Sequence, residues 1–151
     1  DISILDSKTL NLHTIKRQNL NFSYRHLEPE GMIISATLAL KPGNQESIEK
    51  IFKQLLNRKK HTQPVFAASA GCFFKNPAQG MTAGELIEKS GLKGMKMGNA
   101  MVSPVHANYI VNTGNATCDD ILRLKDHIEK TVFMKFRVQL ESEVRIEGDQ
   151  I

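Results

Sequence analysis

The chain has 151 residues, of which 40% are hydrophobic, and this is enough sequence to bury one core. Its 20 Lys and Arg residues exceed its 16 Asp and Glu residues and give a net charge of +4, which suits a phosphorylated ligand. Nucleic acid and membrane are not expected as partners, because no basic run is longer than residues 58–60 and no apolar run reaches about 18 residues.

The cysteines and histidines do not follow the pattern of a metal site. Cys72 and Cys118 lie far apart, and no pair of His or Cys residues has the spacing of metal ligands, so we expect no metal. Two cysteines are enough for one disulfide between them, but a reduced, cytoplasmic protein is the simpler interpretation. The chain begins at Asp1 within sequence that already looks structured, so we expect a fragment of a longer protein.

Residues 1–24 alternate in short strand-like pieces, and residues 6–8 are expected to form a hairpin turn between the first two. Arg25 follows these pieces. Its guanidinium can bind a carboxylate or a phosphate in a bidentate manner, although a solvated surface arginine is an equally good interpretation. A strand is then predicted for residues 32–40.

A helix is predicted from an N-cap at Asn44 to Thr62, because apolar residues recur every three or four positions. Its apolar stripe consists of Ile48, Ile51, Phe52, Leu55 and Leu56. The end of this helix is basic over residues 58–61. These charges either complement the helix dipole or bind a ligand, and the pattern favours neither interpretation.

The chain is organised around residues 68–77, in which four small residues are followed by a thiol, two aromatic rings, a cation and an amide. Small residues let the backbone approach a bound molecule closely. Cys72, Lys75 and Asn76 on one loop suit a site for an anionic ligand. The alternative is a turn that contains a buried, inert cysteine.

The rest of the chain alternates helices and short strands. A capping box at Thr82 and Glu85 predicts a helix over 83–89, and Thr117 caps a second long helix that ends near Met134. Strands are expected at 101–104, 108–111, 136–140 and 144–146. This order predicts an α+β fold, in which an antiparallel sheet of about five strands carries two main helices packed on one face.

Several motifs of the chain occur together in the order found in one enzyme family. They are Tyr24-Arg25, Gln63-Pro64, residues 69–77, 83–88 and 91–94, Ser103 through His106 to Asn112, and residues 140–144. In these motifs the chain resembles UDP-N-acetylenolpyruvoylglucosamine reductase (UDP-N-acetylmuramate dehydrogenase, the MurB family) over nearly its whole length. The resemblance implies that residues 1–25 are the tail of a FAD-binding domain and that residues 32–151 are the C-terminal substrate-binding domain.

The resemblance also implies a two-electron reduction in peptidoglycan biosynthesis. NADPH reduces bound FAD, and UDP-N-acetylglucosamine enolpyruvate then receives hydride at C3 and a proton at C2. Three residues match catalytic positions of the family: Arg25 on the substrate carboxylate side, Cys72 as the proton donor, and Glu143, which can donate to the developing oxyanion if it is protonated. Many relatives carry serine at the position of Cys72. Nearby Lys75 favours a thiolate, so the protonation state of this thiol is open.

Further residues match ligand-binding positions of the family. Substrate binding is implied for Tyr24, Lys60, Lys75, Asn76 and His106, and cofactor binding is implied for Arg58 and Gly71. The flavin-binding half that precedes this region in the family is missing. We therefore expect that the chain alone does not hold FAD and is inactive unless that half is supplied. The alternative function is a non-catalytic module that binds the nucleotide sugar.

Overall fold

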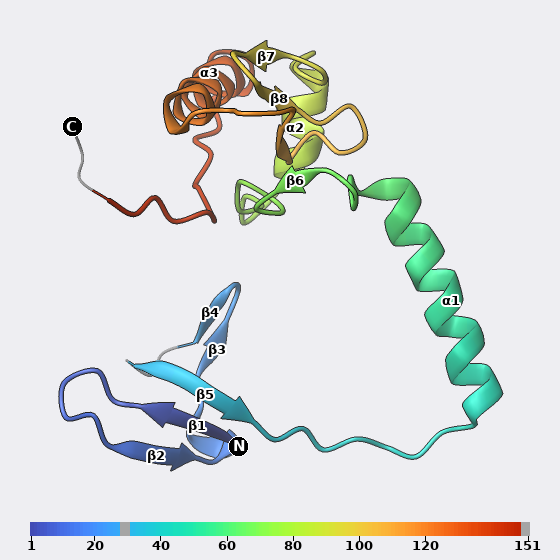
Figure 1. Cartoon of the computed structure of the whole chain (residues 1–151), viewed down its shortest axis with the longest axis vertical. Helices are drawn as coiled ribbons and strands as arrows, with labels where there is room; N and C mark the ends of the chain where they lie inside the picture. Colours follow the sequence, from blue (N-terminus) through green and yellow to red (C-terminus); the bar gives the residue numbers. More distant parts are fainter. Residues whose placement is uncertain (28–30, 149–151) are drawn as a thin grey trace. The chain divides into compact units, whose positions relative to one another are not determined.

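The computed structural model describes residues 1–27 and 31–148 of the chain. The chain divides into two compact units, residues 1–45 and residues 46–151, whose elements are labelled in Figure 1. Within the described residues, no helix is long and apolar enough to cross a membrane.

The first unit is built on a three-stranded antiparallel sheet. Its strands are β1 (Ile2–Leu5), β2 (Leu12–Ile15) and β5 (Met32–Ala36), with β1 in the centre. The predicted turn at residues 6–8 is confirmed. The Asp6 carboxylate accepts hydrogen bonds from the backbone N–H groups of Lys8 and Thr9, at 2.8 and 2.7 Å, and these bonds fold the chain back towards β2.

Three shorter elements complete this unit. They are the 3₁₀ turn η1 (Arg17–Asn19) and the strands β3 (Phe22–Ser23) and β4 (His26–Leu27), which pair with each other. Ile2, Ile4 and Leu20 form a small buried core. The domain predicted to begin at residue 32 would include β5, but β5 pairs with β1 inside the first unit.

The second unit contains a four-stranded antiparallel sheet in the order β6-β9-β8-β7. Its strands are β6 (Ala68–Ser69), β7 (Lys96–Met97), β8 (Ala100–Val102) and β9 (Ile110–Asn112). Its helices are α1 (Gln45–Thr62), which begins at the unit boundary, α2 (Ala83–Lys89) and α3 (Cys118–Phe136). The predicted α+β class is confirmed, although the strands of the described residues belong to three sheets instead of one of about five.

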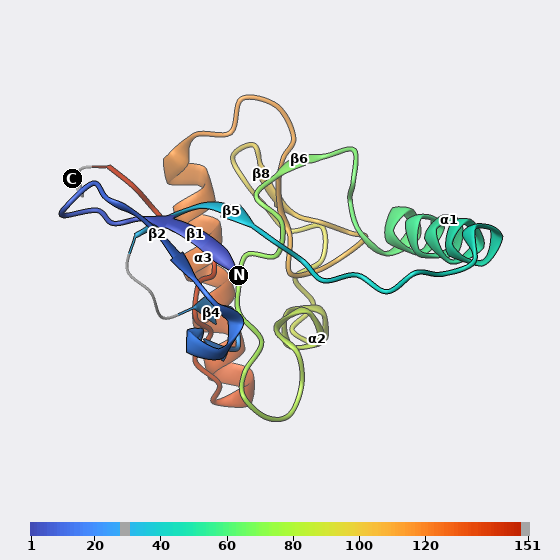
Figure 2. The same ribbon diagram turned by 90° about the horizontal axis from the view of Figure 1, so that it is seen from below.

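The core of the second unit lies beneath α3. Leu124, Ile128 and Val132, spaced four residues apart on one face of α3, are fully buried. This helix packs against β7, β8 and α2, as Figure 1 and Figure 2 show. The α2 residues Leu86 and Ile87 belong to the same core cluster. Burial of these aliphatic side chains is the main stabilising term available to this unit.

The two long helices differ in burial. The predicted stripe on α1 forms, but within α1, all of which the structure describes, no residue is buried, and Phe52 is 62% exposed. The predicted strand at 136–140 is wrong. α3 continues through Phe136, and Arg137 takes a left-handed conformation and donates its backbone N–H to the Phe133 carbonyl at 2.9 Å. This cap ends the helix without starting a strand.

A single carboxylate fixes the start of α3. The Asp120 carboxylate accepts from the backbone N–H of Thr117 at 3.1 Å and of Asn99 at 3.3 Å, and the Thr117 hydroxyl accepts from the Asp120 N–H at 3.1 Å. The turn before β8 therefore passes close to the helix. At Gly98, φ is +54° and an added Cβ would lie 2.1 Å from an Asp120 oxygen, so this position requires glycine.

These hydrogen bonds make the stability of the second unit depend on pH. The backbone N–H of Thr117, followed by that of Asn99, lowers the pKa of Asp120. A lowered carboxyl pKa contributes stability above the pKa of the unfolded state, and this contribution is lost as the pH falls through the folded-state pKa. At neutral pH, Asp120→Asn is therefore expected to unfold at a lower urea concentration than the wild type. As the pH falls below about 4, the variant should lose less stability than the wild type does.

Asp119→Asn is the matched control, because the Asp119 side chain is 74% exposed and pairs only across the helix surface with Arg123. Urea unfolding of the three proteins at several acidic pH values measures the effect. An unchanged acid dependence in Asp120→Asn would contradict this account of the cap.

Candidate active site

The segment that carries Cys72 is held on one side by Asn108. The backbone N–H of Phe73 donates to the Asn108 carbonyl at 2.7 Å, and the N–H of Phe74 donates to the Asn108 side-chain oxygen at 2.9 Å. The Asn108 amide donates in turn to the Phe74 carbonyl at 2.8 Å. Asn108 is only 3% exposed, so these bonds lie in the protein interior. We call this arrangement the Asn108 clamp.

The other side of the same segment pairs with residues 141–143. The backbone N–H of Glu143 donates to the Phe73 carbonyl at 2.8 Å, and the N–H of Lys75 donates to the Glu141 carbonyl at 2.8 Å. Phe74 and Ser142 form an antiparallel bridge between these bonds. Because Cys72 directly precedes Phe73, two predicted catalytic residues, Cys72 and Glu143, lie on hydrogen-bonded neighbouring segments. Their roles stay predictions.

Cys72 is half-buried and contacts Tyr109. The two side chains lie close enough to interact. Burial raises the pKa of Tyr109, and the negative charge that Cys72 carries once it is ionised raises it further. The His106 ring meets the Tyr109 ring edge-on, with 5.0 Å between the centroids. Burial, followed by the positive charge of Lys93, lowers the pKa of His106, so the imidazole is neutral at pH 7.

A hollow of about 280 Å³ opens beside this pair, and we call it the Tyr109 hollow. Its walls come from the end of α1, from the following loop, from β6 and from the central segment. They are lined by Lys59, Gln63, Pro64, Val65, Ala67, Ser69, Gly71 and Tyr109. Gly71 has a φ of +92°, and nothing lies within 4 Å of the position that a Cβ would take, so the backbone here is open to a bound group.

The predicted substrate residues of the second unit are fixed by local contacts. Lys75 forms an ion pair with Glu141. The Asn76 side-chain oxygen accepts from the backbone N–H of Ala83 at 3.1 Å, which places Asn76 at the start of α2. His106 also borders α2, because a Cβ added at Gly84 would lie 3.2 Å from its ring.

The two predicted residues on α1 lie in its last turns. Arg58 and Lys60 are exposed there, and the Arg58 carbonyl accepts from the Thr62 hydroxyl at 2.9 Å. Lys59, between them, lines the Tyr109 hollow. The basic end of α1 thus contributes a cation to the hollow.

Tyr24 and Arg25 belong to the first unit. They form the turn between β3 and β4, where Arg25 has a φ of +57° and its guanidinium carbon lies 5.9 Å from the centre of the Tyr24 ring. Cys72 and Glu143 lie in the second unit. The convergence of all three predicted catalytic residues is therefore a prediction.

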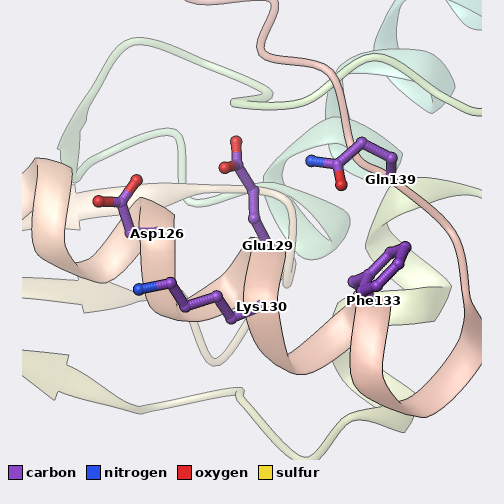
Figure 3. Close-up of a pocket in the computed structure, with 5 residues that line it drawn as sticks. All are labelled: Asp126, Glu129, Lys130, Phe133 and Gln139. Atoms are coloured by element: carbon purple, nitrogen blue, oxygen red, sulfur yellow. The ribbon is translucent and has the colours of Figure 1, made fainter.

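Another hollow, of about 150 Å³, lies on α3 and contains none of the predicted site residues. It is lined by Asp126, Glu129, Lys130, Phe133 and Gln139 (Figure 3). Its carboxylates are already neutralised, because Lys125 Nζ lies 3.0 Å from Asp126 and 3.2 Å from Glu129. Across the described parts of the chain, no group of three or more metal-binding side chains occurs.

Sequence reasoning did not assign a role to Asn108 or Tyr109. A signal for Asn108 was present: it is a polar residue between two apolar strand segments, where a buried amide needs hydrogen-bond partners. Nothing local identifies Tyr109, because its contact with Cys72 joins positions far apart in the chain.

Replacement of Asn108 tests the clamp. Asn108→Ala removes both side-chain hydrogen bonds and leaves buried backbone groups of Phe74 without partners, so we expect a loss of about 2–4 kcal/mol in the free energy of unfolding. Asn57→Ala, at an exposed position of α1, should change it by less than about 0.5 kcal/mol. Urea unfolding compares the two variants with the wild type. Equal stability of both variants would show that the clamp does not hold the segment.

Comparisons with known proteins show which family this chain is similar to. Residues 63–147 match the family model described as UDP-N-acetylenolpyruvoylglucosamine reductase, C-terminal domain. The reductase of Caldanaerobacter subterraneus subsp. tengcongensis is 41% identical over 99% of this chain and 50% of its own length. That of Protochlamydia amoebophila is 45% identical over 95% of this chain and 48% of its own length.

A solved structure is also similar. The crystal structure of UDP-N-acetylenolpyruvylglucosamine reductase (MurB) from Thermus caldophilus superposes with a TM-score of 0.81 at 32% identity and covers 95% of this chain and 51% of that chain. The chain thus spans about half the length of the curated relatives it matches. The family-model match over residues 63–147 and the likeness of the fold show that the chain belongs to the UDP-N-acetylenolpyruvoylglucosamine reductase family, of which it carries the C-terminal domain.

Proposed function

We propose that this chain is the substrate-binding part of a cytoplasmic reductase that converts UDP-N-acetylglucosamine enolpyruvate to UDP-N-acetylmuramate for peptidoglycan synthesis. The observation that carries the proposal is the pairing of the Cys72 and Glu143 segments through Phe73, beside a hollow that Lys59 makes basic. A proton donor and a second acid on adjacent segments suit protonation of an anionic, unsaturated substrate. Membership of the family supports the same reaction.

The reaction demands stabilisation of negative charge. Addition of hydride to C3 of the enolpyruvyl group places charge on the substrate carboxylate, and preorganised donors lower the free energy of that transition state. In the proposal, Arg25 binds the carboxylate, Glu143 in its protonated form donates to the growing oxyanion, and Cys72 delivers the proton to C2.

The remaining residues orient the substrate. His106 Nδ1 accepts from the backbone N–H of Asn108 at 3.2 Å, so the neutral ring carries its proton on Nε2 and can donate it to a substrate oxygen. Tyr24, Lys60, Lys75 and Asn76 complete the proposed substrate contacts. Lysine ammonium groups and an amide suit the diphosphate of a nucleotide sugar.

The residues present fit one edge of a flavin. Gly71 exposes open backbone to the Tyr109 hollow, and Arg58 lies at the basic end of α1, so these two residues would contact the cofactor. A hollow of about 280 Å³ is below the usual size of a site for a drug-sized ligand, about 300–1,000 Å³, and cannot enclose a dinucleotide. When bound, FAD reduced by NADPH supplies the hydride. We infer that the rest of the FAD-binding site lies in a flavin-binding half outside this chain.

A non-catalytic module that binds the nucleotide sugar is the second candidate. It would use the same Lys60, Asn76 and His106 contacts but would not need an acid at Cys72. Calorimetric titration of UDP-N-acetylglucosamine enolpyruvate, with and without a flavin-binding half, separates the two functions. Binding without flavin-dependent turnover would favour the module.

The chain alone is expected to retain no flavin, because the Tyr109 hollow can hold only part of the cofactor. The protein is mixed with FAD, desalted and examined for flavin absorbance. The flavin-binding half of the Caldanaerobacter relative, supplied in the same mixture, is the positive arm and should restore retention. Stoichiometric flavin on the chain alone would refute this prediction.

The proposed proton donor is tested in the complemented enzyme. Cys72→Ala should lower the rate of NADPH oxidation by about 10²–10⁴-fold, the usual contribution of a general acid, whereas Cys72→Ser should retain a measurable part of the rate. Cys118→Ser is the matched control, because Cys118 is exposed at the start of α3. A rate for Cys72→Ala near that of the wild type would remove Cys72 from the mechanism.

A further inference from the structure

We propose that Tyr109 is a positioning residue for the Cys72 thiol. The Tyr109 phenol holds the Cys72 sulfur by a hydrogen bond and reconnects it to water after each proton transfer. The proposal rests on the proposed function in one respect, namely that Cys72 is the group that gives up a proton. It adds a residue to which neither the motifs nor the comparisons assign a role.

The backbone brings the two side chains together. The Asn108 clamp joins Phe73 to Asn108 at 2.7 Å, so Cys72 and Tyr109, the residues on either side of this bond, lie next to each other. The Tyr109 backbone is fixed separately, because its carbonyl accepts from the Ser103 N–H at 2.8 Å and its N–H donates to the His106 carbonyl at 3.0 Å. The phenol therefore approaches the thiol from a rigid support.

The Tyr109 ring is held as firmly as its backbone. The edge-on contact with His106 limits rotation of the ring, and Tyr109 also lines the Tyr109 hollow. Tyr109 thus lies beside Cys72 and also borders an open space. Its hydroxyl can donate to one neighbour while accepting from another.

The chemistry then proceeds in three proton transfers. The Cys72 S–H bond breaks as its proton forms a C–H bond at C2 of the substrate, which leaves a thiolate. The thiolate is stabilised by the Tyr109 O–H donor, and it regains a proton from that hydroxyl while the phenol takes one from water, which leaves hydroxide to exchange with the solvent. The raised pKa of Tyr109 agrees with a phenol that keeps its proton at neutral pH and returns quickly to the neutral form.

Other titratable groups on the neighbouring elements bear on the pH dependence of the pair. They are His106 beside Tyr109, Lys59 from the end of α1, Lys75 on the central segment, and Glu141 and Glu143 on the paired segment. Lys75 is paired with Glu141. Removal of the Tyr109 hydroxyl changes no formal charge among these neighbours. A substitution at Tyr109 therefore tests the hydrogen bond without altering the surrounding charges.

The test is Tyr109→Phe, which keeps the ring and removes only the hydroxyl. The full chain is treated with iodoacetamide from pH 6 to strongly alkaline pH, and alkylation of Cys72 and of Cys118 is followed separately by mass spectrometry of their peptides. At pH 7 we expect alkylation of Cys72 to slow roughly fivefold, a low value for a hydrogen bond to a charged group because the site is half-buried. At strongly alkaline pH, the alkylation rate of Cys72 in the variant should equal or slightly exceed the rate in the wild type, because Cys72 is then ionised in both proteins.

Cys118 is the internal control for folding, because it is exposed at the start of α3 and its rate should not change. A uniform change in the Cys72 rate at every pH would indicate altered access only and would overturn the proposal, as would an unchanged profile. A second measurement uses the Tyr24→Phe chain, in which Tyr109 is the remaining tyrosine. In that chain, ultraviolet titration should show that Cys72→Ala moves ionisation of Tyr109 to lower pH.

These measurements need neither flavin nor substrate, so they separate the proposal from the proposed function. Reductase activity that persists in Cys72→Ala, together with the expected alkylation profile, would refute the proton-donor role and leave the Tyr109 contact standing. Activity that is lost in Cys72→Ala, together with an unchanged profile for Tyr109→Phe, would refute the role of Tyr109 alone.

Discussion

The second unit depends on the pairing of backbone groups around Phe73 and Phe74. Both side chains are buried, and buried backbone N–H and carbonyl groups must find partners within the protein. The Asn108 clamp satisfies one edge of this short segment and residues 141–143 satisfy the other. A segment too short to form a strand of its own is thereby fixed between two distant parts of the chain, and the thiol of Cys72 is fixed with it.

The helices and strands packed around this segment explain why its Gly71 end can border the hollow. α3 buries Leu124, Ile128 and Val132 against the sheet and α2, and the Asp120 cap ties the start of α3 to the turn before β8. These contacts place the stabilising burial beneath the site and leave Gly71 and Tyr109 at the wall of the hollow. The site can therefore contain polar and half-buried groups without weakening the core.

Local patterns predicted the local structure. The hairpin at Asp6, the capping box at Thr82, the Thr117 cap and the extent of α2 follow from hydrogen bonds within a few residues, and such patterns are readable from sequence. The end of α3 at Arg137 was missed because a left-handed cap by arginine carries no glycine signal. The pairing of β5 with β1, and the contact between Cys72 and Tyr109, join distant positions, which periodicity cannot detect.

The same distinction applies to the site. Motifs predicted roles for Cys72, Lys75, Asn76 and Glu143, whereas the clamp that holds Phe73 and Phe74 beside Cys72 became visible in the folded chain. The hydrogen bonds of Phe73 and Lys75 to residues 141–143 use main-chain groups at both ends, whereas the ion pair of Lys75 with Glu141 joins two side chains. The bonds that hold this segment and the side chain at position 72 are thus separate features of the sequence. A substitution of Cys72 by serine would change the acidity of the side chain and leave these main-chain bonds in place.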